Sequence, residues 1–316
     1  MGASRTDWFD AEQLRAAVNM RTVVDHVREA LVGLHGGDFE IPLRFAPGAG
    51  NFLVMPVRHI ASETLVVKSL SANFTGRKPA LSGTITWEEW HTERHVGTDA
   101  AEATAMRTGA VSGVAADLLA APDADSLTVV GAGGQAPDQI RAVLAVRDIS
   151  SVTVAALRRE SAQACIARVA DEFPHVRFTA SDDPRAAVAG ADIICCATPA
   201  KEPLFTLDDL KPGAQVNLIG SYRPEMREMS GADVARTALF VDDVEAVTAE
   251  AGEIIEAVEA GELEPGDLRT LGSALAAGDV AHDPDRVTVF KSVGVAVQDW
   301  ALMRALVDAT TTGTDS

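Results

Sequence analysis

The sequence predicts an α/β protein that combines a Rossmann-type, doubly wound parallel sheet with a mixed α+β domain. Between residues 118 and 285, short apolar runs alternate with helical patterns, which is typical of a parallel sheet with right-handed crossovers. A glycine-rich turn follows the first of these runs. The chain ends, 1–117 and 286–316, have a different pattern, and we expect them to form the second domain together.

Composition places the chain among globular proteins and excludes two classes of partner. At 316 residues it is long enough for one large domain or two ordinary ones, and 47% of its residues are hydrophobic. The net charge is −19, with a pI near 4.7. Nucleic acids and anionic membranes both require a basic surface, so we expect neither as a partner.

The cysteines and the amino terminus indicate a cytoplasmic protein. Cys165, Cys195 and Cys196 have neither a disulfide-framework spacing nor a metal-ligand spacing, and the last two lie in the apolar run ADIICCAT. The first residues lack the apolar core of a signal peptide. No apolar run approaches the length that spans a membrane.

The central region is expected to contain six strands with helices between them. The predicted strands are 126–130, 151–157, 176–180, 191–198, 214–220 and 238–243. The predicted helices are 137–146, 160–173 and 183–190.

Both chain ends contribute to the second domain. Residues 65–74 and 82–96 look like antiparallel strands. Residues 287–307 look like a strand followed by an amphipathic helix, which can pack on the amino-terminal part.

The glycine-rich turn VVGAGGQA predicts a dinucleotide site. It has the G-x-G-x-x-A pattern, directly after a strand and before a helix. The first glycine permits a tight turn, the second admits a pyrophosphate, and the small third residue allows close packing. The free N–H groups of the helix terminus then face the anion. The candidate phosphate-binding residues are Gly131, Gly133, Gly134, Gln135 and Ala136.

The end of the second predicted strand favours NADP(H) over NAD(H). An acidic residue there would bind the ribose hydroxyls of NAD, but the chain reads Ala155, Ala156 and Leu157. Arg158 and Arg159 follow, and guanidinium groups bind a phosphate through paired hydrogen bonds. The alternative is a solvated arginine pair at the start of a helix.

The segment HTERH does not predict a metal site. His91 and His95 are separated as H-x-E-x-H in a β-like stretch, whereas the zinc-protease pattern places glutamate directly after the first histidine of a helix. We therefore expect no metal.

Five segments in sequence order resemble the ornithine cyclodeaminase/mu-crystallin family, over about residues 40 to 305. They are AMRTGAVSGVAADLLA, VVGAGGQA, ADIICCATPAKEPLF, GAQVNLIGSYRPEMREM and VTVFKSVGVAVQDW. The MRTGAVSG and FKSVG elements are the most specific of these. The resemblance implies a homodimer, in which the domain built from both chain ends carries the substrate contacts and the dimer interface.

The resemblance also implies which residues bind ligands. Arg44, Lys68 and Arg107 match family positions that hold a substrate carboxylate, a suitable task for directional cationic donors. Residues that match positions near the cofactor are Thr108, Thr198, Ser221 and Ser292.

Each member of this carboxylate clamp has a plainer interpretation. Lys68 interrupts the apolar run TLVVKSL and could be a surface-facing strand lysine, although the resemblance favours an inward, ligand-facing side chain. Arg107 could be an ordinary helix-surface arginine. Arg44 carries no signal by itself.

Tyr222 distinguishes two branches of the family. The cyclodeaminase branch has an aspartate two residues after the strand-ending glycine, where this chain reads Gly220, Ser221, Tyr222. An unperturbed phenol titrates near pH 10 and supplies no anionic base near neutrality. The sequence from Ser221 to Glu228 is similar to the reductase side of the family instead. Whether Tyr222 faces the ligand or only covers it stays open.

The resemblance therefore implies reduction of an imino acid such as pyrroline-2-carboxylate to the amino acid. The cofactor would supply the hydride, the clamp would position the imine carbon, and Lys68 or a water that it holds would supply the proton. Three alternatives remain: an amino acid or N-substituted amino acid dehydrogenase of secondary metabolism, an ornithine cyclodeaminase, and a low-turnover binding protein like mu-crystallin. The segment WEEWHTERH could shape a larger substrate site in the first alternative.

Overall fold

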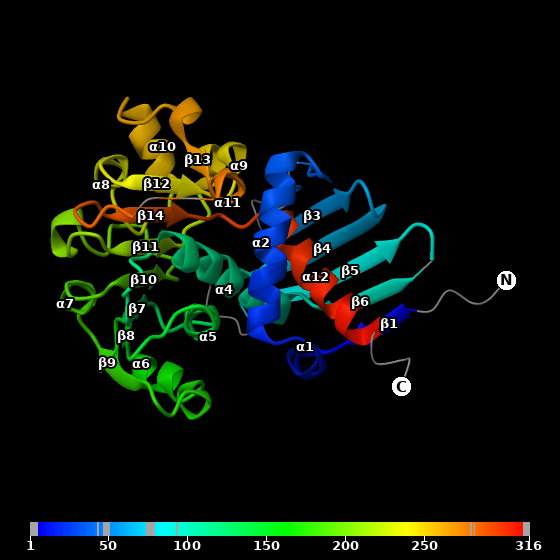
Figure 1. The fold of residues 1–316 in the computed structure, drawn as a ribbon, viewed down its shortest axis with the longest axis horizontal. Coiled ribbons are helices and arrows are strands. Elements are labelled where there is room, and N and C mark those ends of the chain that lie inside the picture. Colours follow the sequence, from blue (N-terminus) through cyan, green and yellow to red (C-terminus); the bar gives the residue numbers. More distant parts are fainter. Residues whose placement is uncertain are drawn as a thin grey trace. The chain divides into compact units, whose positions relative to one another are not determined.

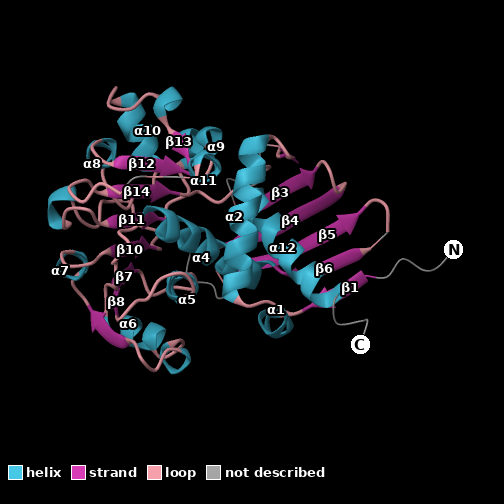
Figure 2. Ribbon diagram, viewed as in Figure 1, coloured by secondary structure: helices cyan, strands magenta, loops and turns pink. Residues whose placement is uncertain are grey.

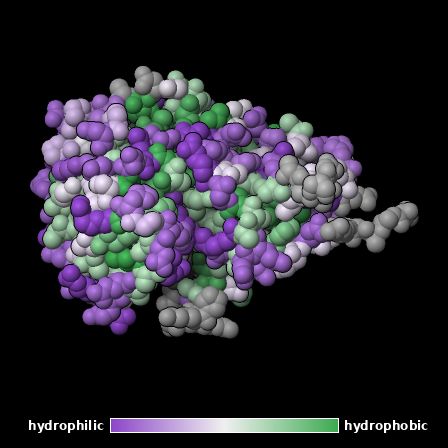
Figure 3. All heavy atoms as spheres, turned by 60° about the horizontal axis from the view of Figure 1, so that its bottom comes forward, coloured by the Kyte–Doolittle hydropathy of each residue, from purple (hydrophilic) through white to green (hydrophobic). Residues whose placement is uncertain are grey.

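A computed structural model describes residues 6–42, 44–46, 51–73, 80–92, 94–278, 280 and 282–311. The chain divides into two compact units, residues 1–107 with 295–316 and residues 108–294. Among the described residues, no helix is both long and apolar enough to cross a lipid bilayer. On the face shown in Figure 3, hydrophilic and hydrophobic side chains are interspersed.

The first unit contains a six-stranded mixed sheet in the order β1-β6-β5-β4-β3-β2. Among the strands that the structure describes there, only β1 and β6 pair in parallel. The strands are β1 (Thr6–Phe9), β2 (Phe39–Glu40), β3 (Phe52–His59), β4 (Thr64–Ala72), β5 (Leu81–Glu89) and β6 (His95–Asp99). The helices are α1 (Ala11–Ala17), α2 (Met20–Gly36), the start of α4 (Ala100–Leu119) and α12 (Ala296–Thr311).

Helices α2 and α12 pack together, and α12 packs on β3, β4 and β5 (Figure 1). Alternate residues of β4 are buried, from Thr64 through Val66 and Lys68 to Ala72, because successive side chains of a strand point to opposite faces. The indole N–H of Trp300 in α12 donates to the Thr64 hydroxyl at 2.9 Å. Lys68 therefore belongs to the row of β4 side chains that α12 covers.

The second unit is built on an eight-stranded, all-parallel sheet in the order β13-β12-β14-β11-β10-β7-β8-β9 (Figure 2). Its strands are β7 (Ser126–Val130), β8 (Ser151–Ala155), β9 (Arg177–Ser181), β10 (Ile193–Cys196), β11 (Gln215–Leu218), β12 (Ala238–Val241), β13 (Arg269–Thr270) and β14 (Thr288–Lys291). Its own α-helices are α5 (Ala136–Leu144), α6 (Arg159–Ile166), α7 (Pro184–Val188), α8 (Gly231–Ala235), α9 (Val244–Glu250), α10 (Gly252–Glu259) and α11 (Leu271–Ala277). Short 3-10 helices lie at Ala170–Glu172, Leu207–Asp209 and Pro265–Asp267.

The expected α/β fold with a doubly wound sheet is confirmed. The strand order reverses between β7 and β10, since β8 and β9 extend the sheet on one side of β7 and β10 begins the other side. Ligands of such sheets bind outside the carboxyl ends of the strands at this reversal. The turn after β7 and the loops after β10 and β11 are therefore the candidate cofactor region.

The boundaries between the two units differ from the expected ones. They lie at Arg107/Thr108 and Gly294/Val295, where the sequence suggested 117/118 and 285/286. Helix α4 runs through the first boundary without a break. Strand β14 pairs with β11 and β12 inside the parallel sheet, so it belongs to the second unit and only α12 returns to the first.

Candidate active site

The glycine turn after β7 has the geometry that a pyrophosphate site requires. Gly131 has φ +111°, and a Cβ atom there would lie 2.6 Å from the Ala197 carbonyl oxygen, so only glycine fits. A Cβ atom at Gly133 or Gly134 would meet open space. Helix α5 then begins at the buried Ala136, and its N-cap Gln135 makes no side-chain capping bond. These features fit a dinucleotide phosphate bound at the start of a helix.

Glu228 joins the ends of β10 and β11. Its Oε1 accepts from the Thr198 N–H and hydroxyl at 2.8 and 2.9 Å, and its Oε2 accepts from the Gly220 N–H at 2.9 Å. Burial raises the pKa of Glu228, while nearby Lys291 and the hydrogen bonds from Thr198 and Gly220 oppose that shift. Thr198, an expected cofactor contact, is thus placed by a buried carboxylate.

Ser221 and Ser292, two further expected cofactor contacts, direct their hydroxyl groups into the second unit. Ser221 is fully buried and donates to Glu253 at 2.9 Å. Ser292 is 1% exposed and donates to Asp242 at 2.7 Å. Both hydroxyl groups are therefore engaged in the core and support the loops that carry them. Thr108 is also buried, and its backbone carbonyl faces the Ser112 hydroxyl within α4.

Asp242 organises the turn after β14. Its Oδ2 accepts from the backbone N–H of Gly294 at 2.9 Å and of Val293 at 3.2 Å, besides the Ser292 hydroxyl. Burial raises the pKa of Asp242, and these donors oppose the shift. Glu228 thus links the ends of β10 and β11, and Asp242 links the end of β12 to the turn after β14.

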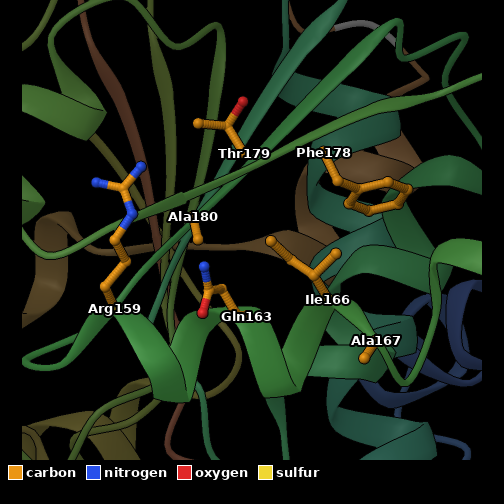
Figure 4. Close-up of a pocket in the computed structure, with 7 residues that line it drawn as sticks. All are labelled: Arg159, Gln163, Ile166, Ala167, Phe178, Thr179 and Ala180. Carbon is orange, nitrogen blue, oxygen red and sulfur yellow. The ribbon is translucent and has the colours of Figure 1, made fainter.

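Arg158 and Arg159 lie where β8 leads into α6. Both are exposed, and neither forms an ion pair within the described part of the chain. Arg159 lines a shallow hollow of about 430 Å³ between α6 and β9, next to Gln163 and Thr179 (Figure 4). Leu157, directly before them, is 95% exposed. This end of β8 therefore offers positive charge and an apolar side chain, with Ala156 and Leu157 at the positions considered for a ribose-binding acid.

Tyr222 packs against the hydrophobic core of the second unit and is partly buried. The Arg223 guanidinium carbon lies 5.4 Å from the centroid of its ring. The ring therefore packs on the core under the loop after β11.

In the first unit, Lys68 and Arg107 share one carboxylate. The Lys68 ammonium group is 1% exposed and lies 2.7 Å from Asp299 Oδ2, while Arg107 Nε lies 3.2 Å from Asp299 Oδ1. Arg107 also donates to Gln298 Oε1 at 2.6 Å. Lys68 is thus not a surface lysine. Within the described residues, these two buried basic side chains thus share one buried carboxylate.

The environment of Lys68 lowers its pKa to about 7. Burial is the largest cause, because removal from water disfavours the charged ammonium group. The positive charges of Arg107 and Arg44 lower the pKa further, and Asp299 opposes them. Arg44 and Arg107 thus both act electrostatically on Lys68, and a pKa of about 7 allows Lys68 to gain or lose a proton near neutral pH.

Several polar residues of these clusters were not identified from the sequence. They are Asp242, Glu253, Lys291, Gln298 and Asp299. Each is less than 2% exposed. Two stand side by side in the apolar run VGVAVQDWALM, and Lys291 ends the apolar strand VTVFK. Charged groups inside such runs are the sequence signal that could have located them.

The chain thus combines a doubly wound parallel sheet, which carries a glycine turn suited to a dinucleotide, with a second unit that holds the buried cluster of Lys68, Arg107 and Asp299. These features define a class of dinucleotide-binding proteins with a separate unit for a second ligand. The sequence profile of the ornithine cyclodeaminase/mu-crystallin family matches residues 6–314. The chain belongs to this family.

Two relatives illustrate the similarity. A Delta(1)-pyrroline-2-carboxylate reductase of Bacillus cereus is 32% identical over 304 residues, which cover 92% of each chain. The ketimine reductase mu-crystallin of Mus musculus is 33% identical over 211 residues, which cover 66% of this chain and 63% of the mouse protein.

Two solved structures are similar to this chain over nearly its whole length. The Delta(1)-pyrroline-2-carboxylate reductase of Thermococcus litoralis, in complex with NADH and L-proline, superposes with a TM-score of 0.89 at 28% identity, covering 97% of this chain and 98% of that one. An archaeal alanine dehydrogenase dimer with bound NAD has a TM-score of 0.87 at 22% identity, covering 98% and 97% of the two chains, and supports the fold alone.

Proposed function

We propose that the protein is an NAD(P)H-dependent reductase of imino acids such as pyrroline-2-carboxylate. The observation that carries the proposal is the buried cluster of Lys68, Arg107 and Asp299, in a chain that belongs to a family with named imino acid reductases. An imino acid offers the anionic group that this cluster can accept. Its C=N bond needs one hydride and one proton.

The chain's own residues bind the carboxylate and hold the proton. Arg107 and Arg44 would donate to the substrate carboxylate, since guanidinium groups match its geometry. Lys68 would carry the proton at Nζ and deliver it to the imine nitrogen. A nicotinamide cofactor, when bound at Gly131, Gly133 and Gly134, supplies the hydride. Tyr222, packed on the core, supplies no carboxylate for ammonia elimination.

The direct test mixes purified protein with NADPH or NADH and either pyrroline-2-carboxylate or piperideine-2-carboxylate. The absorbance of the reduced nicotinamide should fall only when both components are present. Conversion of ornithine to proline and ammonia without imine reduction would contradict the proposal. Nucleotide binding without turnover on any imine or amino acid would point to a binding protein.

We further propose that NADP(H) is preferred over NAD(H). The support is the exposed, cationic end of β8, where Arg158 and Arg159 form no ion pair with the described residues and Ala156 and Leu157 replace an acid. A hydrogen bond to a charged group contributes about 1.5–3 kcal/mol. Replacing both arginines by alanine should therefore weaken NADPH binding about tenfold or more. NADH binding should not change, and an equal loss for both nucleotides would argue against a 2′-phosphate contact.

From the resemblance to the family, we also propose that the protein is a cytoplasmic homodimer. Light scattering during size-exclusion chromatography should give twice the 33.1 kDa chain mass. A mass of one chain would rule the dimer out.

A further inference from the structure

A buried three-residue network lies at the ends of β11 and β14 in the second unit. Lys291 is the last residue of β14, Ser221 lies in the loop after β11, and Glu253 lies in the first turn of α10. All three side chains are fully buried. The register of β11 and β14 pairs Leu218 with Lys291, so the lysine stands where the neighbouring strand gives way to its loop.

The ammonium group of Lys291 has three donors, and the network contains three acceptors for them. It lies 2.6 Å from the Ser221 carbonyl oxygen and 2.9 Å from Glu253 Oε1, and it also contacts the Ser221 hydroxyl. A lysine ammonium has no further hydrogen to donate. A buried charge is tolerated when it is paired and fully hydrogen-bonded, and this one is.

The contact with the Ser221 carbonyl determines the course of the main chain. A peptide unit is planar, so fixing this oxygen also fixes the direction of the following amide in Tyr222. The serine hydroxyl lies 2.9 and 3.1 Å from the two Glu253 oxygens, which prevents the residue from rotating. The start of helix α10 also packs closely against the loop after β11, because a Cβ atom at Gly252 would lie 2.1 Å from the Met226 carbonyl oxygen.

We propose that Lys291 is a positioning residue for the proposed imine reduction, with Glu253 as its counter-ion. From inside the second unit, Lys291 holds the Ser221–Tyr222 peptide in one orientation at the carboxyl end of β11. Ligands of doubly wound sheets bind at this edge. Lys291 itself touches neither substrate nor cofactor. The inference rests on the proposed function for its kinetic part and on the loop geometry for its structural part.

The test uses a pair of neutralising substitutions in the full chain. Lys291→Met alone leaves Glu253 charged and unpaired in the core, and such a protein can fail to fold. The double variant Lys291→Met/Glu253→Gln removes both charges and keeps the approximate volume. Its matched control is Lys211→Met, which removes the ion pair between Lys211 and Asp192 at the amino end of β10.

The double variant should fold, as judged by circular dichroism, and bind the dinucleotide as the wild type does. Hydrogen exchange in the segment 219–230 should become faster, with the central strands unchanged. The kcat for imine reduction should fall about a hundredfold, the loss that a displacement of about 1 Å produces, with KM unchanged. In Lys211→Met, both kcat and exchange of this segment should equal those of the wild type.

Two results would overturn the inference. One is a folded double variant with wild-type kcat; the other is exchange in segment 219–230 no faster than in Lys211→Met. If the wild type reduces no imino acid at all, the proposed function fails, while the exchange measurement still decides whether Lys291 orders the loop.

Discussion

At the scale of single residues, Lys68 shows how burial and neighbouring charges change a pKa. Its pKa of about 7 follows first from burial and then from the positive charges of Arg107 and Arg44, against the opposing charge of Asp299. A substrate carboxylate would add a second negative charge to this cluster. That charge would raise the pKa of Lys68, so substrate binding would be accompanied by proton uptake.

The pH dependence of turnover should therefore show a limb that belongs to Lys68. Because the protonated form would be the donor in the proposed reaction, kcat/KM should decrease as pH rises through about 7, and kcat should decrease at a higher pH. Lys68→Arg keeps the positive charge but does not release a proton, so it should retain KM while losing most of kcat. If Lys68→Arg keeps both the wild-type kcat and the decrease of kcat/KM near pH 7, Lys68 is not the donor.

Stability should depend on pH through the same group. The folded pKa of Lys68 is lowered, so between about 7 and 10.5 the unfolded chain binds a proton that the folded chain lacks. The Lys68 contribution to the free energy of unfolding should rise with pH through this window and be constant below it. In urea titrations at several pH values, Lys68→Met should flatten this rise, and an unchanged slope would contradict the assignment.

Asp299 should be the most sensitive residue of the cluster. In Asp299→Asn, the buried cations Lys68 and Arg107 lose the one carboxylate with which they pair within the described chain. Removing one partner of a buried pair costs about 3–5 kcal/mol of unfolding free energy. Urea unfolding measures this loss. The control is Asp25→Asn, which removes an exposed partner of Arg21 and should change stability by less than about 1 kcal/mol.

At the scale of elements, the loops after β10 and β11 approach each other closely. A Cβ atom at Gly220 would lie 2.1 Å from the Thr198 nitrogen and 2.7 Å from Glu228 Oε1. Gly220→Ala should therefore separate the two loops, at a cost of about 1–3 kcal/mol or more in stability. Thermal unfolding checks this result against Gly190→Ala, where a Cβ atom meets open space. Equal melting temperatures for the two variants would contradict the close packing.

The elements of the parallel sheet could be predicted because each strand is a short apolar run bounded by turn residues. Strand β7 and the start of β8 agree with the predicted ranges. The predicted helix 160–173 is shorter, because α6 ends at Ile166 and a 3-10 turn follows at Ala170–Glu172. The place of β14 could not be predicted, since sheet order depends on contacts between segments far apart in sequence.

The same reason limits prediction of the site. The glycine turn is local, so its residues could be identified from spacing. The pair of Lys68 and Asp299 joins positions 231 residues apart, and neither residue type reveals its partner. Residues that support a site from within the core, such as Glu228 and Lys291, lie in apolar or loop segments whose pattern indicates burial without indicating contacts.

At the scale of the whole molecule, the second unit should gain stability from a bound dinucleotide. A ligand that binds only the folded state at one hundred times its Kd adds about 2.7 kcal/mol. NADPH should therefore raise the melting temperature more than NADH at equal concentration, and the Arg158→Ala/Arg159→Ala variant should remove the difference. A melting temperature insensitive to either nucleotide would contradict the assignment of the glycine turn.

The late position of β14 in the chain has a consequence for biosynthesis. Strands β11 and β12 are not neighbours, and β14 fills the place between them. When a nascent chain has emerged only to residue 280, it therefore carries two strands whose shared partner has not yet left the ribosome. The first unit is incomplete at that stage too, because Asp299, the ion-pair partner of Lys68, lies in α12. Both units are thus complete only when β14 and α12 have left the ribosome, and until then the facing edges of β11 and β12 stay unpaired.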